Sequence, residues 1–365
     1  MNKLVVGNLV HRPLRSLISV FAVAIEVIMI LSIAAIMLGM LNGQRTRTSG
    51  IGMDMLTHPG VGTNLIGMSG ATASIQVADV LRTLPHVAVA APVNIQLTSG
   101  HSLENIYGID YASYNALRPF VFLSGGPFTG PDDVIIDSYQ ALRGFKVGDT
   151  MDILHHTFHV CGIVQNGKGG RKFIPIDTMD AIGGNPGKAS VFYLKLDDPQ
   201  NAEIVRKEIQ ATPGMSQYDV QTLDELLSTL TPDKLPGFNV GLRIVIGTAV
   251  IIGFLVIFQS MYTAVMERTR EIGILKSLGA SRLYIVGVVL RETGLLALAG
   301  IALGVGITYL MRFIFHYRFP TLDFAVTPGW VVSAVLIAFS GAMLGAFYPA
   351  LKAARKDPID ALSYE

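Results

Sequence analysis

The sequence predicts an α-helical membrane protein with four transmembrane helices and an α+β extracytoplasmic domain inserted between helices 1 and 2. Three observations lead to this prediction. Half of the 365 residues are hydrophobic and only 15% are charged, whereas a soluble domain carries roughly 25% charged residues. Four stretches have the roughly 20 mostly apolar residues that a membrane helix needs. No stretch of this kind occurs between residues 44 and 243.

Charged residues mark the ends of the four predicted spans, which are Ser16–Gly43, Ile244–Met266, Thr293–Met311 and Phe324–Leu351. The first span follows a basic start, as signal peptides do. Its apolar part is too long for the usual signal peptide, and no clear small-x-small cleavage site follows it. We therefore expect an uncleaved anchor.

Basic residues in the short loops predict the orientation, because Lys and Arg accumulate on the cytoplasmic side of a membrane. Residues 1–15, residues 267–292 and the tail after residue 351 hold eleven Lys and Arg, against two in the loop between the last two spans. We expect a multi-pass protein of the bacterial cytoplasmic (inner) membrane with both termini in the cytoplasm. Arg45 and Arg47 lie on the wrong side for this rule.

The chain is predicted to have three parts: residues 1–43, with the cytoplasmic N-terminus and first span; an extracytoplasmic domain over 44–240; and 241–365, with spans 2–4 and a cytoplasmic tail. Residues 42–243 hold 15 Lys and Arg and 19 Asp and Glu, a net charge of 15 − 19 = −4. About 200 residues of this composition can bury a core of their own.

Signals for strands and helices alternate in the outer segment. Strands are predicted at Val87–Ala91, Asn94–Thr98, Asp133–Asp137, Met151–Leu154, Thr157–Val164 and Val191–Leu196. Helices are predicted at Thr72–Leu84, Pro199–Ala211 and Thr222–Leu230, the last with Thr222 and Glu225 in capping-box spacing. The pattern favours an α+β domain built from small βαβ-like pieces.

No catalytic, cofactor-binding or metal site is predicted in this chain. The glycine-rich segment 183–189 looks at first like a phosphate-binding loop. Its pattern fails, because Ile182 stands where the first glycine should be and Ala189 where Ser or Thr should hold magnesium. We expect a turn there.

The remaining chemistry-bearing residues also favour plain interpretations. On a strand, His155 and His159 would share a face and His156 would point the other way, so a metal would need ligands from elsewhere. A solvated strand face is the expectation. The single cysteine, Cys161, excludes an internal disulfide framework, and a net charge of +1 gives no reason to expect nucleic-acid binding.

Two polar residues lie within the predicted spans, Glu26 in the first and Gln259 in the second. A carboxylate in lipid is costly, so Glu26 should be protonated, paired or directed into the protein interior. It either lines a path or helix interface, or makes one hydrogen bond to a neighbouring helix. The second interpretation is preferred.

The stretch after the second span predicts a short amphipathic helix. Ile272, Leu275 and Gly279 fall on one helical face, with Arg268 one turn earlier. Glu267–Arg270 and Arg268–Glu271 are i,i+3 pairs of opposite charge. Gly279 is a natural stop, and Ser281 a natural cap for the next helix. Such a helix, joined to a span at each end, suits docking into a protein groove; the alternative is that it only lies on lipid.

The third span is preceded and lined by features that favour helix packing. Residues 283–290 are apolar but are followed by Arg291 and Glu292, which suggests an amphipathic elbow before the span proper. Gly300 and Gly304 have GxxxG spacing, which allows close helix approach and predicts a subunit contact.

Several of these segments resemble the FtsX-like permease family, the membrane subunits of MacB-type ABC transporters. Residues 267–281 (ERTREIGILKSLGAS) resemble the family's signature after its second span, residues 348–362 (YPALKAARKDPIDAL) its closing motif and residues 8–16 its entry to the first span. In the outer segment, Leu142–Asp149 and Phe158–Ile163 are similar to the MacB-type periplasmic core.

The resemblance implies a coupling helix at 267–279 that docks on a separate cytoplasmic ABC ATPase, which would bind ATP and Mg. The implied contact residues are Glu267, Arg268, Arg270, Glu271, Ile272, Leu275, Lys276 and Gly279. The chain departs from the fused MacB arrangement in having no ATPase segment. Charge reversal at Arg268 and Arg270 is expected to uncouple the ATPase with the fold intact.

The implied function is that of a permease subunit, not itself catalytic, which works as a homo- or heterodimer in the lipid bilayer. It would pass the ATPase's movement to the outer domain (mechanotransmission) for export or extraction of a hydrophobic or lipid-linked substrate. One alternative is a non-transporting FtsX-like signalling or scaffold protein that controls a cell-wall enzyme, and another is a membrane-anchored enzyme that uses His155–His159. Substrate, transport direction and use of a periplasmic adaptor stay open.

Overall fold

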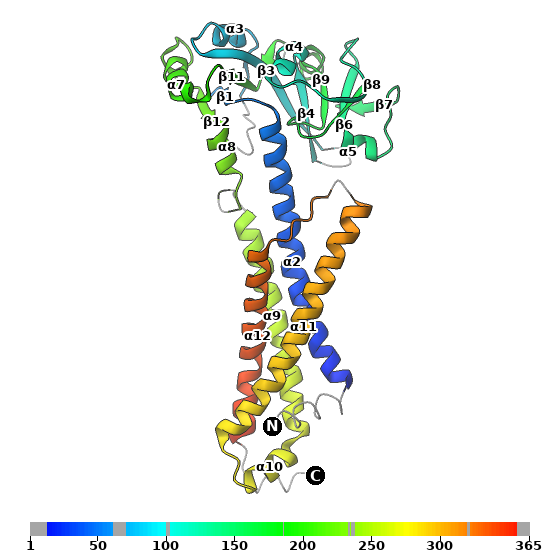
Figure 1. The fold of residues 1–365 in the computed structure, drawn as a ribbon, viewed down its shortest axis with the longest axis vertical. Coiled ribbons are helices and arrows are strands. Elements are labelled where there is room, and N and C mark those ends of the chain that lie inside the picture. The colour runs from blue at the N-terminus through cyan, green and yellow to red at the C-terminus, as the bar shows by residue number, and fades with distance from the viewer. Residues whose placement is uncertain are drawn as a thin grey trace. The chain divides into compact units, whose positions relative to one another are not determined.

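The computed structural model describes residues 13–60, 71–99, 103–184, 186–232, 234, 238–319 and 322–355. The chain separates into two compact units. The helical unit comprises residues 1–40 and 236–365, and the α/β unit comprises residues 41–235. Figure 1 shows the elements of both units, and each unit is described by itself below.

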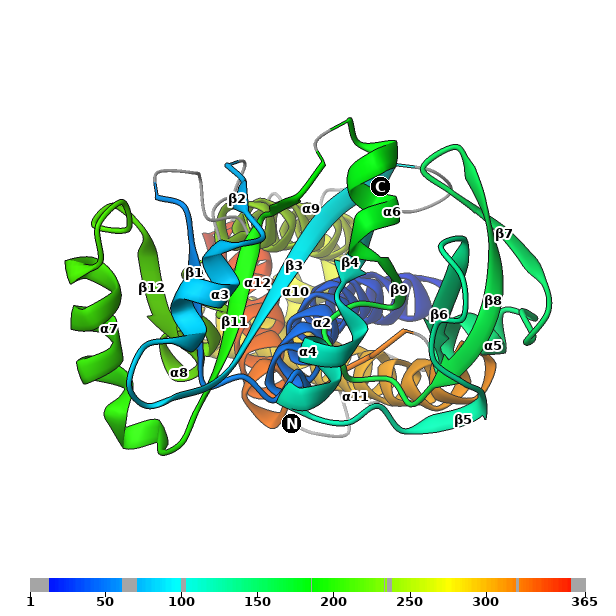
Figure 2. The ribbon, with the colours of Figure 1, turned by 90° about the horizontal axis from the view of Figure 1, so that it is seen from above.

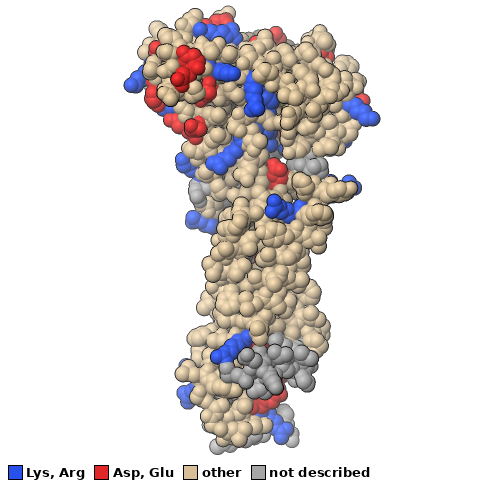
Figure 3. All heavy atoms as spheres, viewed as in Figure 1, with Lys and Arg blue, Asp and Glu red and all other residues tan. Residues whose placement is uncertain are grey.

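Four long helices make up most of the helical unit: α2 (Pro13–Gly50), α9 (Phe238–Glu267), α11 (Arg282–Arg318) and α12 (Pro328–Arg355). Among the described residues, these are the helices long and apolar enough to cross a membrane. On the face drawn in Figure 3, almost no charged side chain lies along the middle of this unit. The predicted fold class, four spans with an α/β domain between the first and the second, is confirmed.

The third span is longer than predicted, because no separate elbow precedes it. Residues 283–290 belong to α11, which runs without interruption from Arg282 to Arg318. Gly287 lies within this stretch without breaking the helix, and Thr293 Oγ1 donates to Val289 O at 3.1 Å along it. Arg291 and Glu292 therefore lie in the same helix as the third span.

Close packing between α2 and α11 depends on the two glycines with GxxxG spacing. A Cβ at Gly300 would lie 2.7 Å from both Val20 O and Val23 Cβ, and one at Gly304 would lie 2.8 Å from Ala24 O. The close helix approach expected at these glycines is therefore made with α2 of the same chain, and the subunit contact expected for this span stays a prediction. Small residues at a membrane helix crossing let the backbones approach.

A mixed β-sheet forms the centre of the α/β unit. Its strands are β1 (Met55–His58), β3 (Val87–Ser99), β4 (Leu103–Ile109), β5 (Phe122–Gly125), β6 (Asp133–Asp137), β7 (Thr150–Ile153), β8 (His156–Val164), β9 (Lys172–Pro175), β11 (Val191–Leu196) and β12 (Asp219–Thr222). The order is β12-β1-β11-β3-β4-β9-β6-β8-β5, with β7 paired to β8 (Figure 2). Short strands β2 (Ala73–Ser74) and β10 (Lys188–Ala189) pair separately.

Two details of the sheet correct the expectations from sequence. Only the β4–β9 and β6–β8 pairs are parallel among the described strands, so antiparallel pairing dominates over βαβ pieces. The two short strands predicted around Pro92 form one strand, β3. Proline is tolerated there because the β3–β4 ladder begins at Val93, so the missing N–H costs no bond of that ladder.

Helices cover both faces of the sheet, and the side chains of each strand alternate between two cores. Tyr193 packs in the core that includes α4 (Tyr111–Leu117), whereas its neighbours Phe192 and Leu194 pack with α3 (Val77–Arg82) and α7 (Ala202–Ala211). Burial of successive residues on opposite faces is what period-2 geometry requires. The remaining helices are α5 (Ser138–Leu142), α6 (Ile176–Ile182), η1 (Pro199–Asn201) and α8 (Leu223–Thr229).

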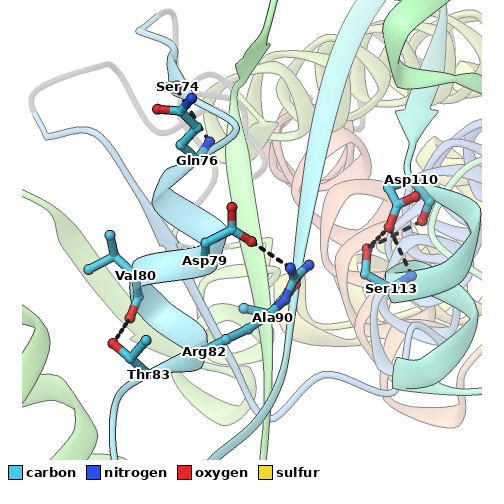
Figure 4. Close-up of polar contacts among 9 residues, drawn as sticks. All are labelled: Ser74, Gln76, Asp79, Val80, Arg82, Thr83, Ala90, Asp110 and Ser113. Carbon is cyan, nitrogen blue, oxygen red and sulfur yellow. Dashed lines mark hydrogen bonds and ion pairs between the residues drawn. The ribbon is translucent and has the colours of Figure 1, made fainter.

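Polar side chains fix where the short helices begin and end. Asp110 Oδ2 accepts from Ser113 N at 3.0 Å at the start of α4, and Arg82 at the end of α3 donates to Ala90 O of β3 (Figure 4). The capping box predicted for Thr222 and Glu225 is present at α8. The helix predicted over Thr72–Leu84 shrinks to α3, because Ala73 and Ser74 pair with β10 instead.

The last turn of α2 lies within the α/β unit, where the loop after β8 holds it. Gly169 N donates to Arg47 O at 2.9 Å, and the buried Lys168 ammonium donates to Ile51 O and Arg118 O. Burial lowers the pKa of Lys168 to about 8, helped by Arg118 and Lys195. Arg45 donates to Leu227 O at 3.2 Å. This arginine lies on the wrong side of the membrane for the distribution of basic residues, but it makes a hydrogen bond within the α/β unit.

Replacement of Gly304 by leucine should destabilise the helical unit, whereas the same change two residues later should not. A side chain at Gly304 overlaps α2, and overpacking of this kind costs about 1–3 kcal/mol. Gly306 has nothing within 4 Å of its added Cβ and serves as the matched control. Thermal unfolding in detergent should show a lower Tm for Gly304→Leu than for Gly306→Leu; equal Tm values would refute the α2–α11 contact.

Candidate functional site: the connection between α9 and α11

A short helix, α10 (Thr269–Ser277), connects α9 to α11 (Figure 1). The helix predicted over 267–279 is therefore shorter at both ends. Glu267 is the last residue of α9, and Arg268 breaks the helix with φ −107° and ψ 19°. Thr269 Oγ1 donates to Val265 O and Met266 O, which satisfies carbonyls at the end of α9. The α9–α11 connection, residues 267–283, is thus two sharp turns around a helix of nine residues.

Gly279 ends α10 as predicted, through paired hydrogen bonds. Ala280 N donates to Leu275 O at 3.0 Å and Gly279 N donates to Lys276 O at 3.0 Å, the two bonds of a Schellman motif. Gly279 has φ +93°, a conformation that other residues rarely adopt. Ser281 Oγ then accepts from Tyr284 N at the start of α11, as the sequence predicted. Both turns are fixed by short-range chemistry.

The inner face of α10 packs on three helices. Ile272 joins a buried cluster of Val265 from α9, Ile285 from α11 and Ala353 and Ala354 from α12. Lys276 Nζ donates to Ala354 O at 3.2 Å, at the end of α12. A small pocket of about 70 Å³ remains between α9, α10 and α11. Movement of α10 would therefore reach all three helices.

An ion pair joins Arg268, in the first turn of the connection, to α11. Arg268 Nη1 lies 3.1 Å from Glu292 Oε2, and the two side chains are only 11% and 6% exposed. The sequence pattern suggested a pair between Arg268 and Glu271, one turn away, and did not identify Glu292 as a partner. The available signal was a carboxylate at the start of the predicted third span, which requires a partner in apolar surroundings.

The outer face of α10 combines charged and apolar side chains. Arg270 and Glu271 are exposed, and neither forms an ion pair within the described part of the chain. Leu278 and Leu283 flank the turn at Gly279 and are 80% and 84% exposed, and Ile274 is exposed one turn before. Sequence reasoning assigned neither leucine to a docking surface, although neighbouring exposed apolar side chains mark interaction sites. We call Arg270, Ile274, Leu278 and Leu283 the outer face.

The two polar residues of the predicted spans lie in different places. Glu26 is buried between helices, whereas Gln259 is exposed on α9. The structure therefore does not bring them together into one polar path. Of the eight predicted contact residues, Arg268, Ile272, Leu275 and Lys276 are half-buried, and the other four are exposed: Glu267, Arg270, Glu271 and Gly279.

The three histidines of the 155–159 cluster do not converge. His155 lies in the two-residue turn between β7 and β8 with φ +63°, so it is not on the strand as expected. His156 Nε2 lies 2.8 Å from Asp132 Oδ1. Within the described ranges, no group of three His, Cys, Asp or Glu side chains is placed to hold a metal.

The glycine-rich segment 183–189 surrounds a carboxylate of its own unit. Lys188 N donates to Asp180 Oδ2 at 2.9 Å, and Asn94 Nδ2 donates to Asp180 Oδ1 at 2.7 Å. An amide that a phosphate loop would offer to its ligand is thus directed to Asp180. Its described residues before β10 (183, 184, 186 and 187) lie in turns, as predicted.

Comparison with known families finds one match that includes most of the α/β unit and a second match within the helical unit. Residues 16–212, more than half of the chain, match the MacB-like periplasmic core domain family. Residues 243–358 match the FtsX-like permease C-terminal family. The second match includes the whole α9–α11 connection.

Individual relatives share these features over part of their length. An uncharacterized ABC transporter permease from Methanocaldococcus jannaschii is 26% identical over 61% of this chain and 59% of its own length. The macrolide export ATP-binding/permease protein MacB from Chromobacterium violaceum is 29% identical over 48% of this chain and 28% of its own length. The periplasmic region of MacB from Actinobacillus actinomycetemcomitans superposes on 50% of this chain and 94% of its own, with 18% identity and a TM-score of 0.40.

Charge reversal should have different effects at Arg268 and Arg270. Removing one member of a buried ion pair costs about 3–5 kcal/mol, so Arg268→Glu should lower the Tm of the purified protein markedly. Arg270→Glu changes an exposed residue and should stay within about 0.5 kcal/mol of the wild type. The structure thus corrects the expectation that both reversals leave the fold intact.

The exchange Arg268→Glu/Glu292→Arg provides the control, because it restores opposite charges at the same two positions. It should recover part of the lost Tm in a thermal unfolding experiment. An Arg268→Glu variant as stable as Arg270→Glu would contradict the ion pair.

Proposed function

Because the chain belongs to the family of FtsX-like permeases with a MacB-like periplasmic core domain, we propose that it is the transmembrane subunit of an ABC transporter. A separate cytoplasmic ATPase would bind ATP and Mg and would dock on the α9–α11 connection. The chain itself would carry no catalytic group. It would transmit movement to the α/β unit rather than perform chemistry.

The observation that supports this proposal best is the division of α10 into two faces. Its inner face is fixed to α9, α11 and α12 by the Ile272 cluster, the Arg268–Glu292 pair and the Lys276 hydrogen bond. The outer face exposes two leucines beside the turn that follows α10, and α10 itself exposes Arg270 and Glu271. A helix that only lay on lipid would bury its apolar side chains in the bilayer. Here the apolar side chains are divided between the inner cluster and exposed turns, which suits a protein groove.

Orientation follows from the basic residues. Eleven Lys and Arg near the termini and in 267–292, against two in the loop between the last two spans, favour a cytoplasmic α10. The α/β unit would then lie outside the cytoplasm, and Arg45 would be engaged by Leu227 O within it.

The proposal extends to the transported material and to the assembly. Glu26 is enclosed between helices, whereas the Gln259 side chain is exposed on the outside of α9. The described residues of the helical unit therefore form no continuous polar path. This favours a mechanotransmission scheme in which a hydrophobic or lipid-linked substrate is handled by the outer domain. Two permease subunits, the same or different, would work together, with a periplasmic adaptor as a further partner.

Aspartate at Leu278 and Leu283 should weaken ATPase docking. Loss of a central apolar contact in an interface costs at least about 1.4 kcal/mol, or tenfold in affinity. The tagged chain would be purified from its native membranes, the co-purifying ABC-type ATPase identified by mass spectrometry, and ATP hydrolysis measured in nanodiscs. Leu278→Asp/Leu283→Asp should retain about a tenth or less of the bound ATPase.

Leu142→Asp is the matched control, because Leu142 is 63% exposed but belongs to the α/β unit. It should bind the ATPase like the wild type. Equal ATPase recovery with all three proteins would exclude the outer face as the docking surface. Absence of any ABC-type ATPase from the wild-type preparation would exclude the proposed function itself.

A further inference from the structure

Glu26 lies in a regular seam between α2 and α9. These helices are antiparallel, and Ser19 Oγ lies 2.6 Å from Ser260 Oγ. Seven residues further along α2 and seven residues back along α9, Glu26 meets Gly253, where an added Cβ would lie 2.0 Å from Glu26 Oε2. The spacing of seven places both contacts on the same side of each helix. Glu26 therefore faces α9 and not the lipid.

The carboxyl group of Glu26 is enclosed. The residue is 3% exposed, and its Oε1 has no hydrogen-bond partner within the described part of the chain. A third helix closes the site, because an added Cβ at Gly341 of α12 would lie 3.8 Å from Oε1. Gly253 and Gly341 thus form a notch, bounded by α9 and α12, that holds the carboxyl of α2.

No charged side chain of the surrounding helices is at this level. The nearest in sequence to the contact positions are Arg243 and Lys352, ten residues from Gly253 and eleven from Gly341. On α11, which meets α2 at Gly304, the nearest is Arg312, eight residues away. At 1.5 Å rise per residue, these charges are about 12 Å or more from the notch along the helix axes.

An ionised carboxylate cannot be accommodated in this position. An isolated charge in a low-dielectric interior costs far more than the native state can spare, so such a group takes up a proton instead. We propose that Glu26 is an intramembrane proton-binding site, a neutral carboxylic acid held between α2, α9 and α12. The bound ligand is a proton, and the site is specific for it because the glycine notch leaves no space for a hydrated cation.

The proposal gives the packed helices a defined protonation state. Where α2 separates from α9 and α12, water would reach Glu26, and the group would ionise like an ordinary glutamate. The packed state therefore binds one more proton than the separated state near neutral pH. By linkage, the stability of the packed state falls as pH rises, by up to tenfold in the unfolding equilibrium per pH unit.

Infrared spectroscopy detects the proposed proton directly. The wild-type protein in lipid nanodiscs at neutral pH should show a C=O stretching band of a protonated carboxyl group, which is lost in Glu26→Gln. Glu292→Gln is the matched control, because Glu292 is similarly buried but is paired with Arg268 and should contribute no such band. A wild-type minus Glu26→Gln difference without this band would overturn the proposal.

Thermal unfolding against pH tests the linkage independently of the infrared signal. Between about pH 5 and pH 9, the Tm of the wild type should fall more steeply than that of Glu26→Gln, whose amide cannot titrate. Parallel curves would contradict a proton bound at Glu26. Neither measurement involves the ATPase, so a failure here is distinct from a failure of the proposed function.

A double-mutant cycle tests the notch. Gly253→Ala should lower the Tm of the wild type, since its Cβ overlaps the Glu26 carboxyl, and should have much less effect in the Glu26→Ala background. Gly247→Ala, on the same helix with nothing within 4 Å, is the control for helix propensity. An equal effect of Gly253→Ala in both backgrounds would contradict the assigned site.

Discussion

The buried ion pair between Arg268 and Glu292 is the interaction on which the arrangement of the helix ends depends. At 3.1 Å and an effective dielectric constant of about 20, its Coulomb attraction is about 5 kcal/mol, much of which offsets the cost of removing both charges from water. The net gain from the pair is therefore modest. The penalty for separating it is large, because each member would be left buried and unpaired. The pair thus resists displacement of α10 from α11 more than it adds to overall stability.

Two glutamates in the helical unit show two ways of placing a carboxyl in apolar surroundings. Glu292 is paired with an arginine near a helix end, where a charged network is available. Glu26 has no such partner within the described residues and is enclosed by glycine positions. The difference follows from position along the helices. An arginine can reach Glu292 from the turn after α9, but no basic residue lies at the level of Glu26.

Features set by local chemistry could be predicted from the sequence. Apolar length identified four spans, Gly279 and Ser281 identified the turns around α10, and the capping box identified the start of α8. Features set by distant segments could not. The partner of Arg268 lies 24 residues away, and the α2 residues that pack against Gly300 and Gly304 lie about 280 residues away in the sequence. Hydrophobic periodicity identifies the buried face of a helix but does not identify the segment that packs on that face.

The same distinction explains the errors in the α/β unit and the strength of the α9–α11 connection. Pro92 suggested two strands because proline lacks an N–H, yet the cost depends on whether a neighbouring strand needs that donor, and β4 begins its pairing one residue later. In the α9–α11 connection, short-range and long-range terms agree. The turn at Gly279 needs no distant partner, whereas the inner face needs α9, α11 and α12 together. The turns of this segment form locally, and its inner face packs on three helices. A displacement of α10 would therefore leave its conformation intact and be transmitted to α9, α11 and α12.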